Sequence, residues 1–442
     1  MISTRTPQRD APHHVVIVGG GAGGLEAATR LGDRLGRRRR AAVTLVDRSR
    51  THVWKPLLHE VAAGSIDVHL HQLDYLAQAR WHHFTFALGA LEGLDRARRE
   101  LRIGPIRDER GAEVIPPRTL RYDTLVIAIG SVANAFGVPG VVEHAFALDS
   151  AADADRFHTR LVNAVLRANY RAEHRDLRVV IVGGGATGVE LAAELHNTTR
   201  VLAAYGLEHI DPERQLKIAL LNADPRILPG LPERIALATA DVLASLGVEV
   251  HCGEQVVEVT ADAVRTKGGR TFPADLTVWA AGIKASDVLR ELDGLETNRL
   301  NQLVVLPTLQ TTRDPDVFAL GDCAACPWEG HPGGVPPRAQ AAHQQASHFA
   351  RTVERRLAGV PPRSWRYRDF GSLVSLGDYS TVGSLMGFLS GPSIRVEGWF
   401  ARLMYLSLYK QHLLALHGGW RVAVDSLART LRRGVDPQVK LH

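Results

Sequence analysis

Two stretches of the chain are near copies of each other: His14–Leu31 reads HVVIVGGGAGGLEAATRL, and Arg178–Leu195 reads RVVIVGGGATGVELAAEL. Each consists of a short β-branched run, a cluster of glycines and an alanine-rich amphipathic run. The first run favours a buried strand and the last favours a helix, so each copy predicts a strand, a tight turn and a helix. The 442-residue chain is also too long for one ordinary core, which fits a protein of two or three domains.

The glycine spacing has a physical reason in both copies. The first glycine permits the tight turn, the third leaves room where a pyrophosphate approaches the backbone, and the last lets the helix pack close to the strand. The pyrophosphate then lies at the helix N-terminus, where free amides and the helix dipole favour an anion. These positions are Gly19, Gly21 and Gly24 in the first copy and Gly183, Gly185 and Gly188 in the second. Two copies predict two bound dinucleotides, FAD and a nicotinamide; a purely structural role for the glycines is the alternative.

The residue that ends the next strand of each copy bears on the choice of nucleotide. Val43–Val46 ends at Asp47, and an acid there accepts hydrogen bonds from ribose hydroxyls. Ile218–Leu221 ends at Asn222, which repels a 2′-phosphate less than an acid would. Arg226 lies nearby and is compatible with either cofactor. Asn222 is therefore a weaker marker of NADH than an acid would be. We expect NADH rather than NADPH, with the strictness of that choice left open.

Further strands that end in glycine assign FAD to the first copy. Tyr122–Ser131, YDTLVIAIGS, predicts a buried strand that ends near Gly130 and crosses beneath a nucleotide. Pro315–Asp322, PDVFALGD, predicts another, with Asp322 at the N-terminus of the following helix. There Asp322 would bond a ribityl hydroxyl or orient the pyrophosphate, and an ordinary helix cap is the alternative. Asp275–Ile283, DLTVWAAGI, closes the second nucleotide domain.

These motifs predict an α/β protein with two Rossmann-like dinucleotide-binding domains, one of them discontinuous. The expected parts are an FAD-binding domain over 11–145, an NADH-binding domain over 146–299, the rest of the FAD-binding domain over 300–365, and a C-terminal α/β extension with amphipathic helices over 366–442.

Six further motifs are more specific than the glycines. They are Trp54–Ile66 (WKPLLHEVAAGSI), Trp279–Ile283 (WAAGI), Gly321–Ala324 (GDCA), Pro336–Gln344 (PPRAQAAHQ), Phe370–Gly387 (FGSLVSLGDYSTVGSLMG) and Leu406–Gly418 (LSLYKQHLLALHG). With them, nearly the whole chain resembles the type II, or alternative, respiratory NADH:quinone oxidoreductases, in particular the bacterial respiratory NADH dehydrogenases. The resemblance implies a glutathione-reductase-like flavoprotein. It would pass hydride from NADH to flavin N5 and two electrons to a membrane quinone, ubiquinone or menaquinone, without pumping protons.

The same resemblance implies roles for individual residues. Lys55, Pro56 and Leu57 are expected to line the isoalloxazine. Glu190 is expected where the nicotinamide stacks on the flavin, with a helix-surface position or a ribose contact as alternatives. Gln340 and Gln344 lie one helical turn apart, so they share a face that would meet the quinone head group. The expected cofactor-binding residues also include Gly23, Ala281, Gly282 and Ala342. Asn222 departs from the family, which often has an acid there.

The C-terminal tenth of the chain combines basic, apolar and aromatic residues. From Arg395 onward there are eight Lys or Arg residues and three acids. Gly418–Gly419 is expected to separate two amphipathic helices, which favours peripheral binding to anionic lipid on the cytoplasmic face of the bacterial inner membrane. Packing against the protein's own core, or against a second subunit of a homodimer, is the alternative. Nucleic acid is disfavoured by the many large apolar residues. No apolar run approaches the length of a membrane span, and Met1–His14 lacks the apolar core of an export signal.

The three cysteines keep a second flavoenzyme class open. Cys323 and Cys326 form a CxxC pair, as a disulfide-type flavin reductase or a sulfide:quinone oxidoreductase would need near its flavin. Such reductases place their pair near the N-terminus, however, where this chain has no cysteine. Cys252 ends an apolar strand and is expected to pack. We expect no role in turnover for Cys323 and Cys326 and no metal site. A non-catalytic NADH sensor on the same fold is a further alternative.

Overall fold

The computed structural model describes residues 12–170, 176–204, 215–375, 381–385, 394–397, 410 and 412–432. The chain divides into two compact units. The first unit comprises Met1–His52, Leu73–Gly130 and Ala285–Arg368, and the second comprises Val53–Gln72, Ser131–Lys284 and Asp369–His442. Each unit therefore draws on separate stretches of the chain, and the domain limits expected from the sequence stay a prediction.

The first unit is built on a six-stranded sheet in the order β23-β24-β11-β1-β2-β5. Five strands are parallel and β23 is antiparallel to β24. The central strands are almost continuous apolar runs because both faces of the sheet are covered; Val15, Ile17 and Leu125, for example, are fully buried. The strands are β1 (His13–Val18), β2 (Ala41–Asp47), β5 (Thr85–Leu88), β11 (Thr124–Ile127), β23 (Gln310–Thr311) and β24 (Asp314–Ala319).

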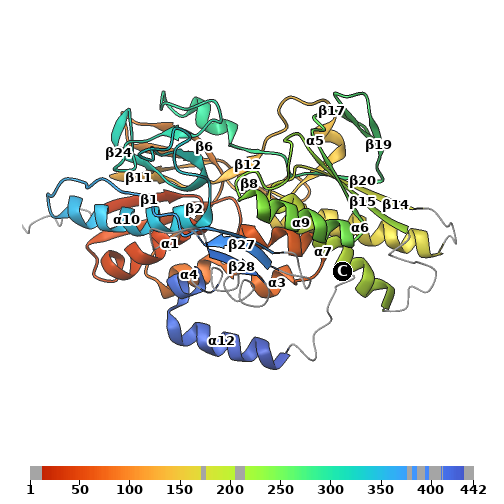
Figure 1. Cartoon of the computed structure of the whole chain (residues 1–442). Helices are drawn as coiled ribbons and strands as arrows, with labels where there is room; N and C mark the ends of the chain where they lie inside the picture. The colour runs from red at the N-terminus through yellow and green to blue at the C-terminus, as the bar shows by residue number, and fades with distance from the viewer. Residues whose placement is uncertain are drawn as a thin grey trace, which may run out of the picture. The chain divides into compact units, whose positions relative to one another are not determined.

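Two long helices of the first unit, α1 (Ala22–Leu31) and α10 (Ala339–Leu357), pack side by side (Figure 1). Shorter elements complete the unit. They are η1 (Gly32–Gly36), β3 (Thr51–His52), β4 (Leu73–Asp74), α4 (Tyr75–Trp81), β6 (Leu91–Asp95), β7 (Glu100–Ile103), β8 (Ile106–Arg107), β9 (Glu113–Ile115), β10 (Arg118–Arg121), η3 (Asp287–Glu291), β22 (Leu303–Val304), η4 (Gly321–Cys323) and β25 (Ala324–Ala325).

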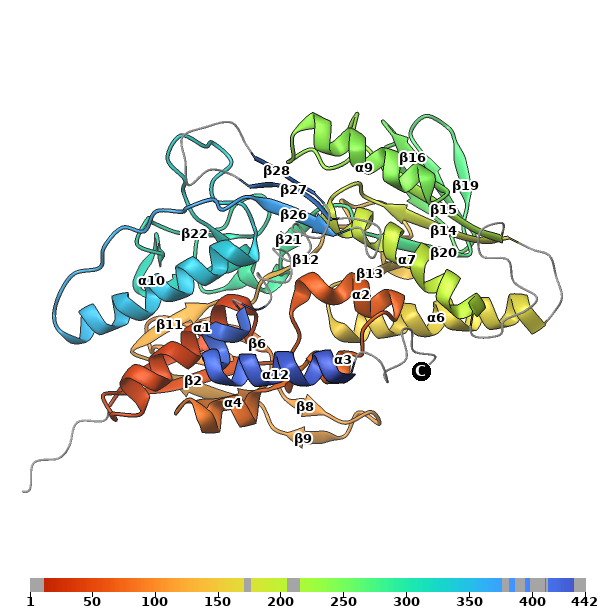
Figure 2. The same ribbon diagram turned by 60° about the horizontal axis from the view of Figure 1, so that its bottom comes forward.

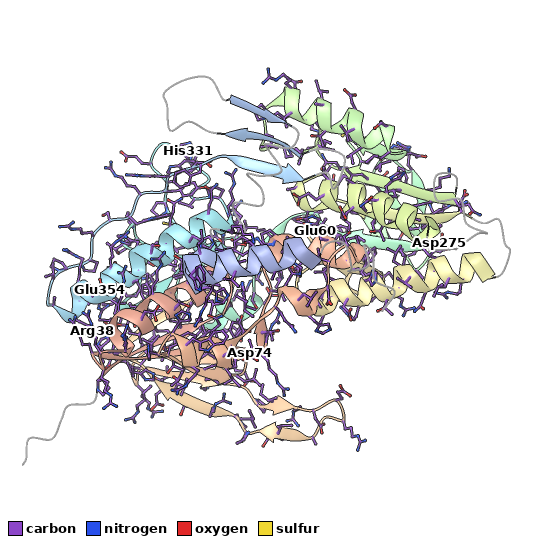
Figure 3. The ribbon with its side chains drawn as sticks, turned by 90° about the horizontal axis from the view of Figure 1, so that it is seen from below. Arg38, Glu60, Asp74, Asp275, His331 and Glu354 are labelled. Atoms are coloured by element: carbon purple, nitrogen blue, oxygen red, sulfur yellow. The ribbon has the colours of Figure 1, made fainter. Side chains whose placement is uncertain are left out.

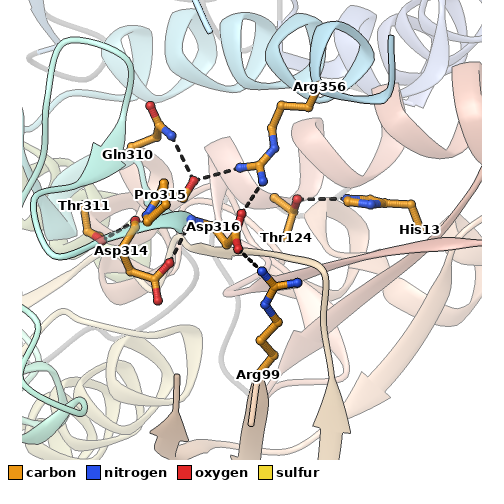
Figure 4. A network of polar contacts seen from close by, with 9 residues as sticks. All are labelled: His13, Arg99, Thr124, Gln310, Thr311, Asp314, Pro315, Asp316 and Arg356. Carbon is orange, nitrogen blue, oxygen red and sulfur yellow. Dashed lines mark hydrogen bonds and ion pairs between the residues drawn. The ribbon is translucent and has the colours of Figure 1, made fainter. Parts of the chain in front are cut away.

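Strand β24 enters this sheet from late in the chain and is fastened by a polar network (Figure 4). The carboxylate of Asp316 forms ion pairs with Arg99 and Arg356. Arg356 also donates to the Pro315 carbonyl at 2.8 Å. These contacts join β24 to the turn before β7 and to α10, and β24 itself pairs with β11.

Four strands of the second unit, β20-β14-β15-β16, are ordered like β11-β1-β2-β5 of the first, whereas the edge strand β13 precedes the others in the chain and β24 follows them. The five-stranded sheet of the second unit runs β13-β20-β14-β15-β16, and every neighbouring pair is parallel. The strands are β13 (Ala145–Ala147), β14 (Leu177–Val182), β15 (Leu216–Asn222), β16 (Val248–Cys252) and β20 (Leu276–Trp279). The two Rossmann-like halves predicted from the glycine repeats are confirmed.

Helices α6 (Ala151–Tyr170) and α7 (Ala186–Ala204) of the second unit both contact the short helix α2 (Leu58–Ala63) (Figure 2). Buried apolar residues from all three helices belong to one core cluster. The unit's other elements are η2 (Lys55–Leu57), α3 (Val68–His71), β12 (Ser131–Ala133), α5 (Val141–His144), α9 (Glu233–Ser245), β17 (Val256–Val259), β18 (Ala263–Thr266) and β19 (Thr271–Pro273). Strand β21 (Ile283–Ala285) pairs with β12.

The C-terminal extension contains an antiparallel sheet of β26 (Ser372–Ser375), β27 (Thr381–Leu385) and β28 (Ile394–Glu397), followed by helix α12 (Gly419–Arg432). Residues 412–417 are helical, and Gly418, with φ of +74°, separates them from α12. The break predicted at Gly418–Gly419 is confirmed. Residues 398–409 and 433, which belong to the C-terminal region expected to bind lipid, lie outside the described residues.

Candidate functional site

The first glycine loop joins β1 to α1. Gly19 has φ of +101°, where side chains are disfavoured, and a methyl group on it would lie 2.4 Å from the Ala128 carbonyl oxygen. A methyl group on Gly24 would lie 1.8 Å from the Gly19 oxygen, so α1 approaches β1 this closely only without a side chain. A methyl group on Gly21 would instead enter open space, with no atom of the described residues within 4 Å beyond its chain neighbours. The loop therefore leaves room where a pyrophosphate is expected.

Three side chains hold Gly20 in the middle of this loop. Asp47 Oδ2 accepts a hydrogen bond from the Gly20 amide at 2.6 Å. The buried Tyr75 hydroxyl donates to the Gly20 carbonyl at 2.8 Å, and His52 Nδ1 lies 2.9 Å from the same oxygen. Burial lowers the pKa of His52 to about 4, so the ring is neutral at pH 7 and its proton lies on Nδ1, since a carbonyl only accepts. Burial also raises the pKa of Asp47, although hydrogen bonds from the Gly20 and Ser49 amides oppose that shift.

The second glycine loop, between β14 and α7, repeats the geometry of the first. Gly183 has φ of +117°, and a methyl group on it would lie 2.6 Å from the Ala280 carbonyl carbon. A methyl group on Gly188 would lie 2.0 Å from the Gly183 oxygen. A methyl group on Gly185 would enter open space, as at Gly21. The residues present thus fit two dinucleotides, one at each loop.

Asn222 braces the second loop from within. Its Oδ1 accepts from the Gly184 amide at 3.1 Å, and its Nδ2 donates to the carbonyls of Arg226 at 2.8 Å and Asp224 at 3.3 Å. The side chain is buried, and the Gly184 carbonyl accepts from the Leu228 amide at 2.7 Å. The Arg226 guanidinium donates to main-chain carbonyls of its own loop. A ribose contact for Asn222 stays a prediction.

Asp322 does not begin a long helix, and that expectation was wrong. It lies in η4, a single 3-10 turn, and α10 begins only at Ala339. Gly321, with φ of +74°, turns the chain, and its amide donates to Oε1 of the buried Gln345 at 2.7 Å. Gln345 thus shapes the Asp322 turn from within α10. Gln345 was not identified from the sequence, because it lies one residue beyond the motif Pro336–Gln344.

The other glycine and alanine positions lie in turns or where elements pack closely. A methyl group on Gly23 would lie 3.3 Å from the Ala342 Cβ, so the structure brings these two residues together where α1 meets α10. Gly130 and Gly282 have φ of +71° and +65°. A methyl group on Gly282 would lie 2.5 Å from the Phe136 ring, and the segment containing Ala281 is tied down by Trp279 Nε1, which donates to the Asn134 carbonyl at 2.8 Å. The cofactor contacts expected here stay predictions.

Lys55, Pro56 and Leu57 form the 3-10 turn η2. The Lys55 ammonium donates to the Ser131 carbonyl at 2.8 Å and lies 3.4 Å from Asp149 Oδ1. Asp149 also accepts from the Ala133 amide at 2.9 Å. Asp149 therefore helps to orient Lys55, and no spacing in the sequence links these residues.

Glu190 lies on α7, and only 7% of its surface is exposed. The helix-surface alternative is therefore wrong. Its Oε2 lies 3.5 Å from Nδ1 of the buried His59. His59 belongs to the WKPLLHE motif, and nothing in its position along the chain indicates a contact with Glu190.

Gln344 and Gln340 lie on α10, and Gln344 has main-chain partners. Gln344 Nε2 donates to the Arg368 carbonyl at 2.8 Å, and its Oε1 accepts from the Arg368 amide at 3.1 Å. This pair of bonds holds the segment that follows α10. Gln340 is half-buried. The quinone contacts expected of both residues stay predictions.

The CxxC cysteines are buried. Burial raises the pKa of Cys323 and of Cys326 to about 12, so neither forms the thiolate that redox exchange requires. The Cys323 thiol faces the carbonyls of Ile127 and Leu320 at 3.4 and 3.3 Å. Cys252 is exposed, so the expectation that it packs in a core was wrong. Among the described residues, no cluster of three or more potential metal ligands occurs.

The C-terminal helices have both buried and exposed apolar residues. Leu413, Leu416 and Val422 are buried. Trp420 is 80% exposed and Val424 is 49% exposed. The packing alternative therefore applies to the buried residues, and contact of the exposed ones with lipid stays a prediction. No helix in the described part of the chain is long and apolar enough to cross a membrane.

Two glycine loops that fit dinucleotides, each at the end of a strand in a parallel sheet, define the class of this protein. The family model described as pyridine nucleotide-disulphide oxidoreductase matches residues 13–346. The fold is similar to NDH2 from Plasmodium falciparum in complex with NADH (TM-score 0.77, 18% identity, 97% of this chain and 100% of that chain). It is also similar to the sulfide:quinone oxidoreductase from Aquifex aeolicus (TM-score 0.71, 18% identity, 96% of each chain).

Sequence comparison narrows the class to one family. The chain is 42% identical to the type II NADH:quinone oxidoreductase of Haemophilus influenzae, over 97% of this chain and 100% of that protein. It is 29% identical to type II NADH:quinone oxidoreductase Ndh of Mycobacterium tuberculosis, over 96% and 88%. The chain belongs to the type II NADH:quinone oxidoreductases.

Proposed function

We propose that this protein oxidises NADH with FAD and passes two electrons to a membrane quinone without pumping protons. The observation that carries the proposal is the pair of equivalent glycine loops. At the third glycine of each, Gly21 and Gly185, a methyl group would meet no atom of the described residues within 4 Å beyond its chain neighbours. Two dinucleotide sites in one chain suit hydride transfer between two nucleotide cofactors. Membership of the family supports the quinone as the final acceptor.

The two loops divide the cofactors between them. The first loop and Asp47 hold FAD, with the start of α1 at the pyrophosphate. The second loop, between β14 and α7, holds NADH in the same manner. When bound, FAD accepts hydride from NADH and delivers two electrons to the quinone. The protein's part is to bind both nucleotides and to orient them for transfer.

Three groups of residues act on the bound molecules. The Lys55 ammonium, oriented by Ser131 and Asp149, provides positive charge and a donor beside the flavin. Glu190 provides a buried carboxylate at the nicotinamide. Gln340 on α10 provides the amide for the quinone head group. Gln344 braces the Arg368 main chain, and so it supports the quinone site at least through the position of the segment after α10.

The C-terminal helices bring the enzyme to its lipid-soluble substrate. Exposed Trp420 and Val424 on α12 provide apolar and aromatic surface, and Arg421 between them is exposed. Aromatic, apolar and cationic side chains together favour the interface of an anionic bilayer. The protein is then peripheral on the cytoplasmic face of the bacterial inner membrane, and contact with a second copy to form a homodimer is the competing use of the same surface.

A disulfide-type or sulfide-oxidising flavoenzyme is the second candidate, because the Aquifex aeolicus enzyme has the same fold. Buried Cys323 and Cys326, with the pKa of each raised to about 12, argue against it. A non-catalytic NADH sensor is the third candidate, and only turnover with a quinone excludes it.

Anaerobic mixing separates these candidates. NADH is added to the purified flavin-loaded protein while the flavin absorbance is followed, and a water-soluble quinone is added afterwards. Bleaching by NADH and rapid recovery with quinone is the expected result. Bleaching without recovery would overturn the quinone assignment in favour of a sensor or a disulfide-type acceptor, and no bleaching would overturn the assignment of both nucleotides.

A further inference from the structure

His59 is a buried titratable residue without a role in the function described so far. It is the second residue of α2, directly after the turn formed by Lys55–Leu57, and its side chain is 4% exposed. Burial lowers its pKa to about 4, although a hydrogen bond to the main chain at Pro56 opposes this shift. The ring is therefore neutral at pH 7 and carries one N–H.

The two ring nitrogens face different carboxylates. Nδ1 lies 3.5 Å from Glu190 Oε2 on α7, and Nε2 lies 3.8 Å from Glu60 Oε1 on α2 itself. Glu190 is buried, whereas the Glu60 side chain is 23% exposed and is visible on the second unit in Figure 3. The Nδ1 contact is thus the shorter of the two and the more shielded from solvent. Because polar interactions are stronger away from water, we expect it to be the stronger contact.

Helix α2 is also fixed in place around His59. The Ser65 hydroxyl donates to Glu194, one helical turn after Glu190 on the same face of α7. Gly64 ends α2 with φ of +84°, and a methyl group there would lie 2.2 Å from His158 Cε1 on α6. A helix held tightly on both sides cannot shift to compensate for a lost contact without cost.

We propose that His59 is a positioning residue whose Nδ1 holds the Glu190 carboxylate in one orientation. This inference rests on the proposed function, since it matters to catalysis only if Glu190 acts on the bound nucleotides. A displacement of about 1 Å at such a group lowers hydride-transfer rates by one to two orders of magnitude, because the reaction depends on orientation.

Three substitutions at one position test the atom that matters. His59→Asn keeps an N–H donor near the place of Nδ1, His59→Gln keeps one near the place of Nε2, and His59→Leu keeps none. We expect flavin reduction by NADH to slow at least tenfold in the Leu and Gln variants and to recover to within about threefold in the Asn variant. The NADH dissociation constant, measured by calorimetry, and the spectrum of the oxidised bound flavin should stay close to wild type.

Two further variants complete the test. Ser65→Ala removes the hydrogen bond from the residue after the α2 C-cap to Glu194 on α7, so it is the matched control for general loosening and should leave the rate within about twofold. His59→Leu combined with Glu190→Gln should be no slower than Glu190→Gln alone, because both changes break the same contact.

The outcomes separate this inference from the proposed function. If NADH does not reduce the wild-type flavin, the proposed function fails. If the wild type is reduced and the Asn, Gln and Leu variants share one rate, whether fast or slow, the positioning role of Nδ1 is wrong. A slowed Ser65→Ala variant would also overturn it, since packing of α2 would then explain the effect. If the Leu variant does not fold, the comparison of Asn with Gln decides alone.

Discussion

The two glycine loops differ in how they are held, although their glycines have the same geometry. At the first loop, the side chains of Tyr75 and His52 bond the Gly20 carbonyl, whereas at the second loop the main-chain amide of Leu228 bonds the Gly184 carbonyl. Both loops therefore satisfy the same backbone oxygen, but only at the first loop do side chains bond that oxygen.

The amide side of each loop shows a second difference. Asp47 bonds the Gly20 amide and Asn222 bonds the Gly184 amide, so an acid in one unit corresponds to an amide in the other. Asn222 also donates to two carbonyls of its own loop, which a carboxylate cannot do. The comparison teaches that the turn itself is dictated by the glycines, while its support is free to vary with the local surroundings.

The largest effect is expected from a methyl group at the helix glycines. Gly24→Ala places a carbon 1.8 Å from the Gly19 oxygen, and Gly188→Ala places one 2.0 Å from the Gly183 oxygen. We expect the first variant to lose bound FAD, and the second to keep FAD and bind NADH at least a hundredfold more weakly. Flavin content by absorbance and NADH titration measure these effects.

Gly21→Ala and Gly185→Ala are the matched controls, because their methyl groups meet no atom of the described residues beyond the chain neighbours. Their melting temperatures without added nucleotide should match the wild type, while FAD or NADH affinity falls. Equal affinity in these controls would show that the open side of the loop is not the phosphate site.

Acid should destabilise both units, and one deeply buried histidine in each contributes to this loss. Burial lowers the pKa of His52 and of His59 to about 4, below the ordinary value of 6.5. The unfolded chain binds these protons first, so this stability is present above pH 6.5 and is lost as the pH falls toward 4. Each histidine should contribute about 2 kcal/mol of lost stability between pH 7 and pH 5.

Urea unfolding at the two pH values measures this loss. His52→Asn and His59→Asn should each reduce the pH dependence, and a variant of exposed His83 should leave it unchanged. A pH dependence that is the same in all three variants would contradict the assignment of neutral, buried rings.

Tyr75→Phe should affect only the first loop. It removes the hydroxyl that donates to the Gly20 carbonyl and leaves His52 as the remaining side-chain donor there, which costs about 1 kcal/mol. We expect FAD affinity to fall about fivefold and NADH affinity to stay unchanged. Tyr122→Phe is the matched control, because the buried Tyr122 hydroxyl has no partner among the described residues. An equal loss of FAD in both variants would mean that Tyr75 acts through packing alone.

The smallest effect is expected at the CxxC cysteines of the first unit, Cys323 and Cys326. Cys323→Ser keeps a donor facing the carbonyls of Ile127 and Leu320, and turnover with NADH and quinone should stay within about twofold of wild type. Cys326→Ser should behave in the same way. A loss of turnover greater than tenfold in either variant, with flavin content intact, would restore the disulfide-type alternative.

Much of the fold and part of the site are predictable from local patterns. The glycine loops, the parallel strands and the strand ends at Asp47 and Asn222 follow from apolar runs and spacing that act over about 30 residues. The helix expected at Asp322 was wrong because the residues after Gly321 form one short turn, which no strong local signal distinguishes from a helix start.

The sequence by itself determined the strand, turn and helix of each nucleotide loop, because a positive φ and a close helix approach demand glycine whatever surrounds them. Only the tertiary structure decided which side chains support the loops and the carboxylate. Tyr75 is 55 residues from Gly20 along the chain, and His59 is more than a hundred residues from Glu190. Such pairs depend on how whole elements pack, and packing leaves no fixed spacing in one sequence.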